Sequence, residues 1–239
     1  MKVDWGAYAS ELAHGLLRTL EYTVLGFVGA IVLGLALALM RLGPTRLIRL
    51  PAAIYTELFK NIPLLAIIFI IYFGLPSAGI RLDPLAAGSL SLIIFYAAYL
   101  SEIFRAALKG VPPGQQEGAQ ALGMSKMRTF RAVIMPQALR LALPGTATMG
   151  VDLLKSTSLL VTIAAGELMS EGSQISSETF RAMEVYLVIA AIYFVVCYPV
   201  SQALLLLERK VHAGTPLTPG RSRRMARTRS ILEVGAMQR

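Results

Sequence analysis

Five long apolar blocks alternate with shorter polar segments along the 239 residues of the chain. A transmembrane helix needs about 20 mainly apolar residues, because only a helix of that length satisfies its own backbone hydrogen bonds across a hydrocarbon core of ~30 Å. The pattern therefore predicts an all-α, polytopic membrane bundle of five transmembrane helices, over residues 23–40, 54–72, 85–108, 141–165 and 185–207.

Two of the five blocks are less regular than the others. The second contains Glu57, Lys60 and Pro63 ahead of its strongly apolar run. Either its spanning helix begins near Pro63, or a longer helix is kinked there; we favour a kinked or interfacial start. The fourth block carries Asp152 and Lys155, which makes it the weakest span by hydropathy.

Small residues recur at every fourth position of the first block, at Gly26, Ala30, Gly34 and Ala38. This spacing places them on one face of a helix. We expect another helix to approach closely along that face.

A polar segment over residues 109–140 separates the third and fourth blocks. Pro112 and Pro113 mark its start, and the pattern predicts two short helices, over residues 115–122 and from Ser125 towards Pro136, with Gly123 between them. Residues 166–183, rich in Ser and Glu, are expected to form a polar connector.

Charge fixes the expected orientation. The chain has a net charge of +9 and 23 basic residues. With the N-terminus outside, seventeen of them lie in segments that face the cytoplasm and four in segments that face outward, as the retention of Lys and Arg on the inner side requires. Residues 1–211 are thus the predicted membrane domain, and residues 212–239 a basic, disordered cytoplasmic tail attracted to anionic lipid. The basic residues do not gather on one face between aromatic residues, so nucleic acid is not an expected partner.

The polar segment contains a spaced motif. Glu117, Gly118 and Ala119 are followed after three residues by Gly123, and after nine more by the run that contains Val133, Met135 and Pro136. This resembles the EAA loop of permeases of ATP-binding-cassette importers. Further stretches resemble the polar amino acid permeases of the histidine/glutamine type, over roughly residues 15–211: KNIPLL (60–65), IYFGLP (71–76), AAYLSEIFRAAL (97–108), MPQALRLALP (135–144) and LLKSTSLL (153–160).

The resemblance implies a multi-pass permease of the bacterial inner membrane that imports polar amino acids by alternating access. It also implies separate ATPase subunits that dock on the EAA loop, a second permease that is a copy or a homologue, and an extracytoplasmic amino acid binding protein. The chain has no Gly-Lys dipeptide and therefore no phosphate-binding loop of its own, so we expect no cofactor and no enzymatic activity in this subunit. Gly118 replaces the family alanine, either for a closer approach of the partner or because glycine is tolerated.

Asp152 and Lys155 lie three residues apart, on one face of the fourth helix. Charges at membrane depth usually line a pathway or a subunit interface. The resemblance places the substrate pathway here, with Lys155 holding an α-carboxylate and Ser156, Thr157 and Ser158 donating hydrogen bonds. The alternative is a structural ion pair between Asp152 and Lys155.

Two further charged pairs have the same spacing, namely Glu57 with Lys60 and Glu102 with Arg105. Both are expected to be helix-end pairs or elements of a gate rather than ligands. His14 and His212 have no partner at ligand spacing, so no metal site is expected.

Two other classes of protein compete with the permease. A secondary transporter is disfavoured because the chain shows no internal repeat and five spans are few to enclose a pathway. An intramembrane enzyme is disfavoured because no catalytic constellation appears at the required spacing.

Overall fold

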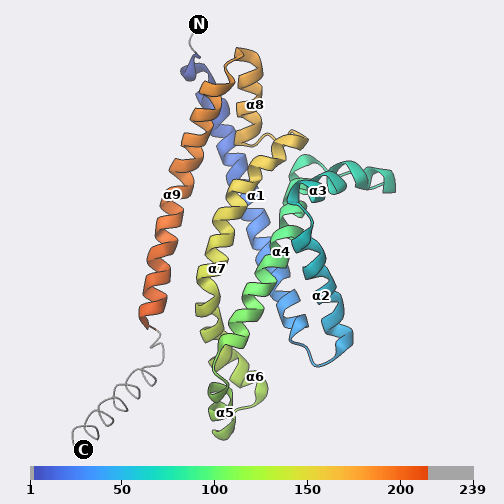
Figure 1. The fold of residues 1–239 in the computed structure, drawn as a ribbon, viewed down its shortest axis with the longest axis vertical. Helices are drawn as coiled ribbons and strands as arrows, with labels where there is room; N and C mark the ends of the chain where they lie inside the picture. The colour runs from blue at the N-terminus through green and yellow to red at the C-terminus, as the bar shows by residue number, and fades with distance from the viewer. Residues whose placement is uncertain (1–2, 215–239) are drawn as a thin grey trace, which may run out of the picture.

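The computed structural model describes residues 3–214, and within that range the chain is helical without a strand (Figure 1). The long helices α1, α4, α7 and α9 run along one long axis, with the N-terminus at the end opposite to α5 and α6, and the segment from α3 to η2 projects sideways. The elements are α1 (Trp5–Arg41), α2 (Arg46–Asn61), α3 (Leu64–Phe69), η1 (Ile70–Gly74), η2 (Leu75–Ala78), α4 (Pro84–Gly110), α5 (Pro113–Ala121), α6 (Lys126–Thr129), η3 (Phe130–Ile134), α7 (Met135–Ser156), η4 (Thr157–Ile163), α8 (Leu168–Thr179) and α9 (Ala182–Gly214).

Helix α1 is about twice as long as the predicted first span, which began at Thr23. Its 37 residues correspond to a length of about 55 Å, whereas a hydrocarbon core is ~30 Å thick. The helix begins where the side chain of Asp4 accepts a hydrogen bond from the backbone N–H of Gly6 at 3.1 Å. The charged first half of α1 therefore projects beyond the apolar block on the N-terminal side.

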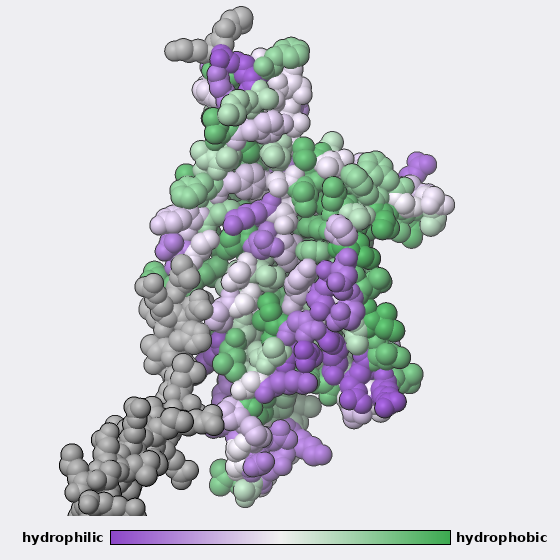
Figure 2. Space-filling view, in the orientation of Figure 1, coloured by the Kyte–Doolittle hydropathy of each residue, from purple (hydrophilic) through white to green (hydrophobic). Residues whose placement is uncertain are grey.

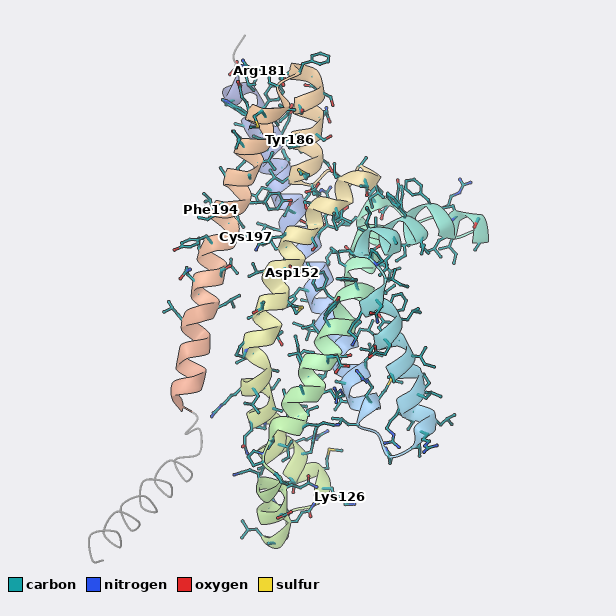
Figure 3. The ribbon with its side chains drawn as sticks, viewed as in Figure 1. Lys126, Asp152, Arg181, Tyr186, Phe194 and Cys197 are labelled. Carbon is teal, nitrogen blue, oxygen red and sulfur yellow. The ribbon has the colours of Figure 1, made fainter. Side chains whose placement is uncertain are left out.

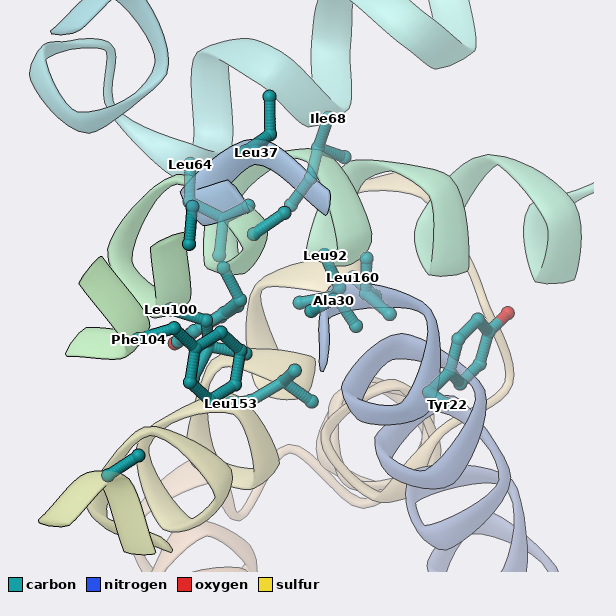
Figure 4. Packing of buried hydrophobic residues seen from close by; sticks show 14 of the residues in the cluster. Tyr22, Ala30, Leu37, Leu64, Ile68, Leu92, Leu100, Phe104, Leu153 and Leu160 are labelled. Atoms are coloured by element: carbon teal, nitrogen blue, oxygen red, sulfur yellow. The ribbon is translucent and has the colours of Figure 1, made fainter. Parts of the chain in front are cut away.

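The small-residue face of α1 packs against α4, as predicted. Gly26, Ala30, Gly34 and Ala38 are all buried. A Cβ atom added at Gly34 would lie 2.9 Å from the Cβ of Leu100 and 3.1 Å from a backbone oxygen of α4. The main apolar core surrounds this contact and joins α1 and α4 to side chains of α3, α7 and η4 (Figure 4).

The second span is broken rather than gently kinked. Helix α2 ends at Asn61, and the next helical segment leaves at an angle of 106°. Ile62 is extended (φ −97°, ψ 130°), as expected of a residue whose helical conformation would clash with the ring of the following proline, Pro63. Both α2 and α3 contact α4, so the two halves of the broken span pack against the same helix.

The polar segment after α4 forms one short helix and the start of a long one. Helix α5 agrees with the first predicted helix, and Gly123 behind it has the positive φ of 77° that favours glycine. The expectation of a second, separate helix is wrong, because α6, η3, α7 and η4 follow one another without a break from Lys126 to Ile163. The turn before Pro136 is π-helical, which lets the helix continue past a residue without an N–H donor.

The predicted polar connector over residues 166–183 contains helix α8. One face of α8 is apolar, and its Leu168 and Ile175 pack against Leu12 of α1 and Val185 and Ile189 of α9. The opposite face carries the Ser residues that made the segment look like a loop. Helix α8, the start of α1 and the start of α9 thus form a second apolar core at the N-terminal end of the molecule (Figure 1).

Three described helices, α1, α4 and α9, are long and apolar enough to cross a membrane. Two bent pairs, α2 with α3–η2 and the run ending in η4 with α8, supply up to two more. Counted in this way, the spans are the five that the sequence predicts, and the all-α membrane bundle is confirmed. Residues 215–239 of the predicted tail lie outside the described residues.

Candidate translocation site and coupling surface

Asp152 lies on α7 and is held by a tyrosine of α4. The hydroxyl of Tyr96 donates a hydrogen bond to Oδ2 of Asp152 at 2.9 Å and lies 2.8 Å from the hydroxyl of Ser156. Tyr96 is buried near the middle of α4, and Asp152 lies at about the level of Cys197 on α9 (Figure 3). A carboxylate is therefore presented well inside the membrane-spanning part of the bundle.

Lys155 follows one turn later on α7 and is exposed. Among the described residues, no hydrogen bond or ion pair joins its ammonium group to Asp152 or to any other side chain. The expected alternative of a structural ion pair between the two is therefore not what the structure shows. The hydroxyls of Thr157 and Ser158 donate to the carbonyls of Leu154 and Lys155, at 2.7 and 2.8 Å, so they turn back on their own helix.

Two open cavities of about 290 Å³ each lie between the α7–η4 segment and α9. Lys155 lines both of them. We call the one towards the coupling loop the inner cavity, lined by Pro144, Thr148, Val151, Asp152, Lys155, Ser201 and Leu204. The other is the outer cavity, lined by Lys155, Ser158, Met169, Tyr186, Ile189, Ala190 and Tyr193.

The two predicted charged pairs meet in one network. Glu102 of α4 accepts hydrogen bonds from Arg105 at 2.6 Å and from Arg41 of α1 at 2.6 Å, and the Nζ of Lys60 lies 3.7 Å away. Lys60 also donates to Glu57 at 3.2 Å. One carboxylate thus connects α1, α2 and α4, and Figure 2 shows hydrophilic residues gathered over the lower parts of α1 and α2 in this region.

Replacing Glu102 with glutamine should weaken this connection between three helices. The side chain of Arg41 is only 14% exposed, so its guanidinium would lose a charged partner in a poorly solvated position. Charged hydrogen bonds contribute about 1.5–3 kcal/mol each. We expect a lower melting temperature in detergent, measured by fluorescence. Glu57→Gln is the matched control, because Glu57 contacts only Lys60 in this network; an equal loss in both variants would contradict the central role of Glu102.

The motif residues of the polar segment lie at the far end of the molecule. Glu117, Gly118, Gly123 and Pro136 are exposed, and Val133 and Met135 are half-buried. Ala119 is buried inside the chain, at 6% exposure, so it holds α5 in place instead of meeting a partner. No other atom lies within 4 Å of a Cβ added at Gly118, so no contact within the described chain requires glycine there.

Two large apolar side chains stand out from this end. Leu122 is 84% exposed and Met127 is 60% exposed. Both lie beside the motif residues and make little contact with their own chain, so they are available to an apolar surface of a partner. We call Glu117, Leu122 and Met127 the coupling surface, since they form the candidate contact with the ATPase.

Leu122→Asp should reduce retention of the ATPase about tenfold or more, because it places a charge in the apolar part of the coupling surface. Leu122→Met keeps the apolar contact and should retain the partner. Both variants should express and purify alike, since residue 122 makes little contact with its own chain. Co-purification with a tagged permease measures the difference, and equal retention in the two variants would exclude Leu122 from the interface.

Two residues of these sites were not predicted. Tyr96 is separated from Asp152 by 56 positions, and Arg41 from Glu102 by 61. Arg41 is one of the seventeen basic residues counted on the cytoplasmic side, and no partner was predicted for it. Helix periodicity carries no signal for either pair, because both join helices that are distant in the sequence.

Comparison with known proteins identifies the chain. Residues 30–213 match the family described as the binding-protein-dependent transport system inner membrane component. The chain belongs to this family. It is a permease subunit of an ATP-binding-cassette importer, it lies in the bacterial inner membrane, and it works with ATPase partners.

Several relatives of this permease cover nearly its whole length. It is 35% identical over 202 residues to the probable glutamine ABC transporter permease protein GlnM of Bacillus subtilis, which covers 84% of this chain and 94% of that protein. It is 33% identical over 216 residues to the glutamine transport system permease protein GlnP of Escherichia coli, covering 88% and 99%. The crystal structure of an amino acid ABC transporter with histidines matches with a TM-score of 0.81 and 36% identity, over 88% of this chain and 100% of that chain.

Proposed function

We propose that this permease is one of two membrane subunits that import polar amino acids delivered by an extracytoplasmic binding protein. The observation that carries the proposal is Lys155, an exposed ammonium group without a partner among the described residues, one turn from Asp152 and deep in the bundle. A free amino acid carries one carboxylate and one ammonium group. The two side chains offer the complementary pair of charges.

The remaining pathway residues have supporting roles. Tyr96 keeps Asp152 in place, while Ser156, Thr157 and Ser158 can exchange their present hydrogen bonds for bonds to the cargo. Asp152 receives the α-ammonium group and Lys155 the α-carboxylate. The names of the two glutamine permeases among the relatives support this substrate class.

The exposure of Asp152 and Lys155 is the reason to propose a second membrane subunit. Placing one charged side chain at the centre of a lipid-facing helix costs about 2.5–3.5 kcal/mol or more. Asp152 and Lys155 are both exposed in the single chain. A second permease, identical or homologous, covers this face and turns the open cavities into part of an enclosed route.

Energy reaches the site through α7. ATP binds to the partner ATPase subunits, and their closure moves the loop from Glu117 to Pro136. The helical run from Lys126 to Ile163 contains the end of this loop as well as Asp152 and Lys155. Displacement of the loop is thereby passed along this helical run to Asp152 and Lys155. The Glu102 network acts as a gate that holds α1, α2 and α4 together on the cytoplasmic side. ATP drives the change because it binds one state better than the other.

Reconstitution tests this proposal. The permease, its ATPase and its binding protein in lipid vesicles should accumulate a polar amino acid only when ATP is supplied on the ATPase side. Omitting the binding protein should lower uptake strongly. Uptake without ATP, from a chain that brings down no ATPase, would show a secondary transporter instead.

A further inference from the structure

We propose that the outer cavity is a side-chain pocket which, together with Lys155, favours neutral and anionic amino acids over cationic ones. This inference rests on the proposed function, because it assigns the pocket to the same cargo. It goes further because it states which charge the side chain of the transported amino acid can carry. The argument uses the position of Lys155, the lining of the outer cavity and the bonding of the nearest carboxylates.

Lys155 stands at the boundary between the two cavities. Asp152 lines the inner cavity and does not line the outer one. Cargo whose carboxylate meets Lys155 and whose ammonium group points to Asp152 therefore has its side chain directed into the outer cavity. The volume there is about 290 Å³, and Met169, Tyr186 and Ile189 line it together with Lys155.

Within residues 3–214, the lining of the outer cavity carries positive charge and no negative charge. Of the described residues that line it, Lys155 is the only charged one. The other polar groups of the lining are the hydroxyls of Ser158, Tyr186 and Tyr193, which are neutral and carry no charge to balance that of Lys155. A second positive charge placed here is repelled by the ammonium group of Lys155.

The one fully buried carboxylate among the described residues, Glu167, is already hydrogen-bonded. Glu167 is fully buried and accepts hydrogen bonds from the backbone N–H groups of Met169 and Ser170 at 2.8 and 2.7 Å. It also accepts from the hydroxyls of Ser170 and Tyr193, at 3.0 Å each. Tyr193 thus lies between this carboxylate and the outer cavity, and Glu167 has little capacity left to attract a cationic side chain.

Thiol labelling can measure the charge of the cavity. Cys197 is the only cysteine of the chain, so Cys197→Ser gives a background without a thiol. Ser158→Cys then places a single thiol in the wall of the outer cavity, and Ser77→Cys places one at an exposed position away from both cavities. The assembled complex is labelled with two methanethiosulfonate reagents, one bearing a sulfonate and the other a trimethylammonium group.

We expect the thiol at position 158 to react about tenfold faster with the sulfonate reagent than with the trimethylammonium reagent, after correction by the ratio at position 77. Adding Lys155→Met to Ser158→Cys should abolish the preference. Glutamine should protect position 158 from labelling, and arginine at the same concentration should not.

Three results would overturn the inference. Equal corrected rates would show that the cavity is not electropositive, and protection by arginine as well as glutamine would show that it does not discriminate. A thiol at position 158 that reacts with neither reagent, while position 77 reacts, would place the cavity against lipid. ATP-driven uptake by the unmodified complex is measured in the same preparation, so that its absence marks a failure of the proposed function instead.

Discussion

Lys155→Met should abolish ATP-driven amino acid uptake, with a loss of about tenfold or more in initial rate. Methionine has a similar length and removes the charge that is proposed to bind the α-carboxylate. Because Lys155 has no ion pair among the described residues, its replacement breaks no salt bridge between the described helices. Folding and assembly should therefore be preserved, and uptake in vesicles together with size-exclusion chromatography measures both.

The same substitution at another position provides the control. Lys109 lies in the last turn of α4, is exposed and lines neither cavity. Lys109→Met should leave uptake close to that of the unmodified permease. If Lys155→Met instead lowered the yield of assembled complex while the remaining complex transported normally, Lys155 would be a structural residue.

The sequence predicted those features that depend on positions close together along the chain. Gly26, Ala30, Gly34 and Ala38 are buried on one face because a helix repeats every 3.6 residues, whatever packs against it. The break at Ile62–Pro63 follows from the steric requirement of one proline. Gly123 ends α5 in a turn with positive φ, a backbone conformation that favours glycine. In each case the cause lies within a few residues of the effect.

Features that depend on distant contacts escaped prediction. Residues 168–179 are polar enough to resemble a loop, and they are helical because a narrow apolar face, with Leu168 and Ile175, packs on α1 and α9. Hydropathy averaged over the segment hides that face. An ion pair with Lys155, three residues away, was the alternative considered for Asp152, whereas the carboxylate accepts a hydrogen bond from Tyr96 on another helix. The position of Tyr96 in the sequence gives no sign of this contact.

The role of the site residues illustrates the same limit. The substrate pathway and the coupling surface were placed by resemblance to a family, and the structure adds how their side chains are held. Ser158 and Thr157 turn back on their own helix, and Ala119 packs inward. The two hydroxyl bonds are local, because they reach carbonyls three residues earlier, whereas the burial of Ala119 depends on how α5 packs on the rest of the chain.

Gly34→Ala should destabilise the permease, although alanine ordinarily favours a helix over glycine by about 0.5–1 kcal/mol. The added methyl group would lie 2.9 Å from the Cβ of Leu100 and 3.1 Å from the carbonyl oxygen of Ala97. The carbonyl belongs to the backbone of α4 and cannot rotate away, so the two helices must separate. Overpacking of a tight contact costs about 1–3 kcal/mol, which outweighs the gain in helix propensity.

Gly118→Ala is the matched comparison, because it makes the same change in an exposed helix where the new Cβ meets no atom within 4 Å. There only the helix propensity changes, so this variant should be as stable as the unmodified chain or slightly more stable. The melting temperatures of the two variants in detergent should therefore shift in opposite directions. A fall in both would mean that glycine is needed for a reason common to the two helices, and a rise in both would mean that α1 and α4 can separate without loss. If Gly118→Ala keeps its stability and its ATPase but transports more slowly, the glycine serves a close approach of the partner to α5.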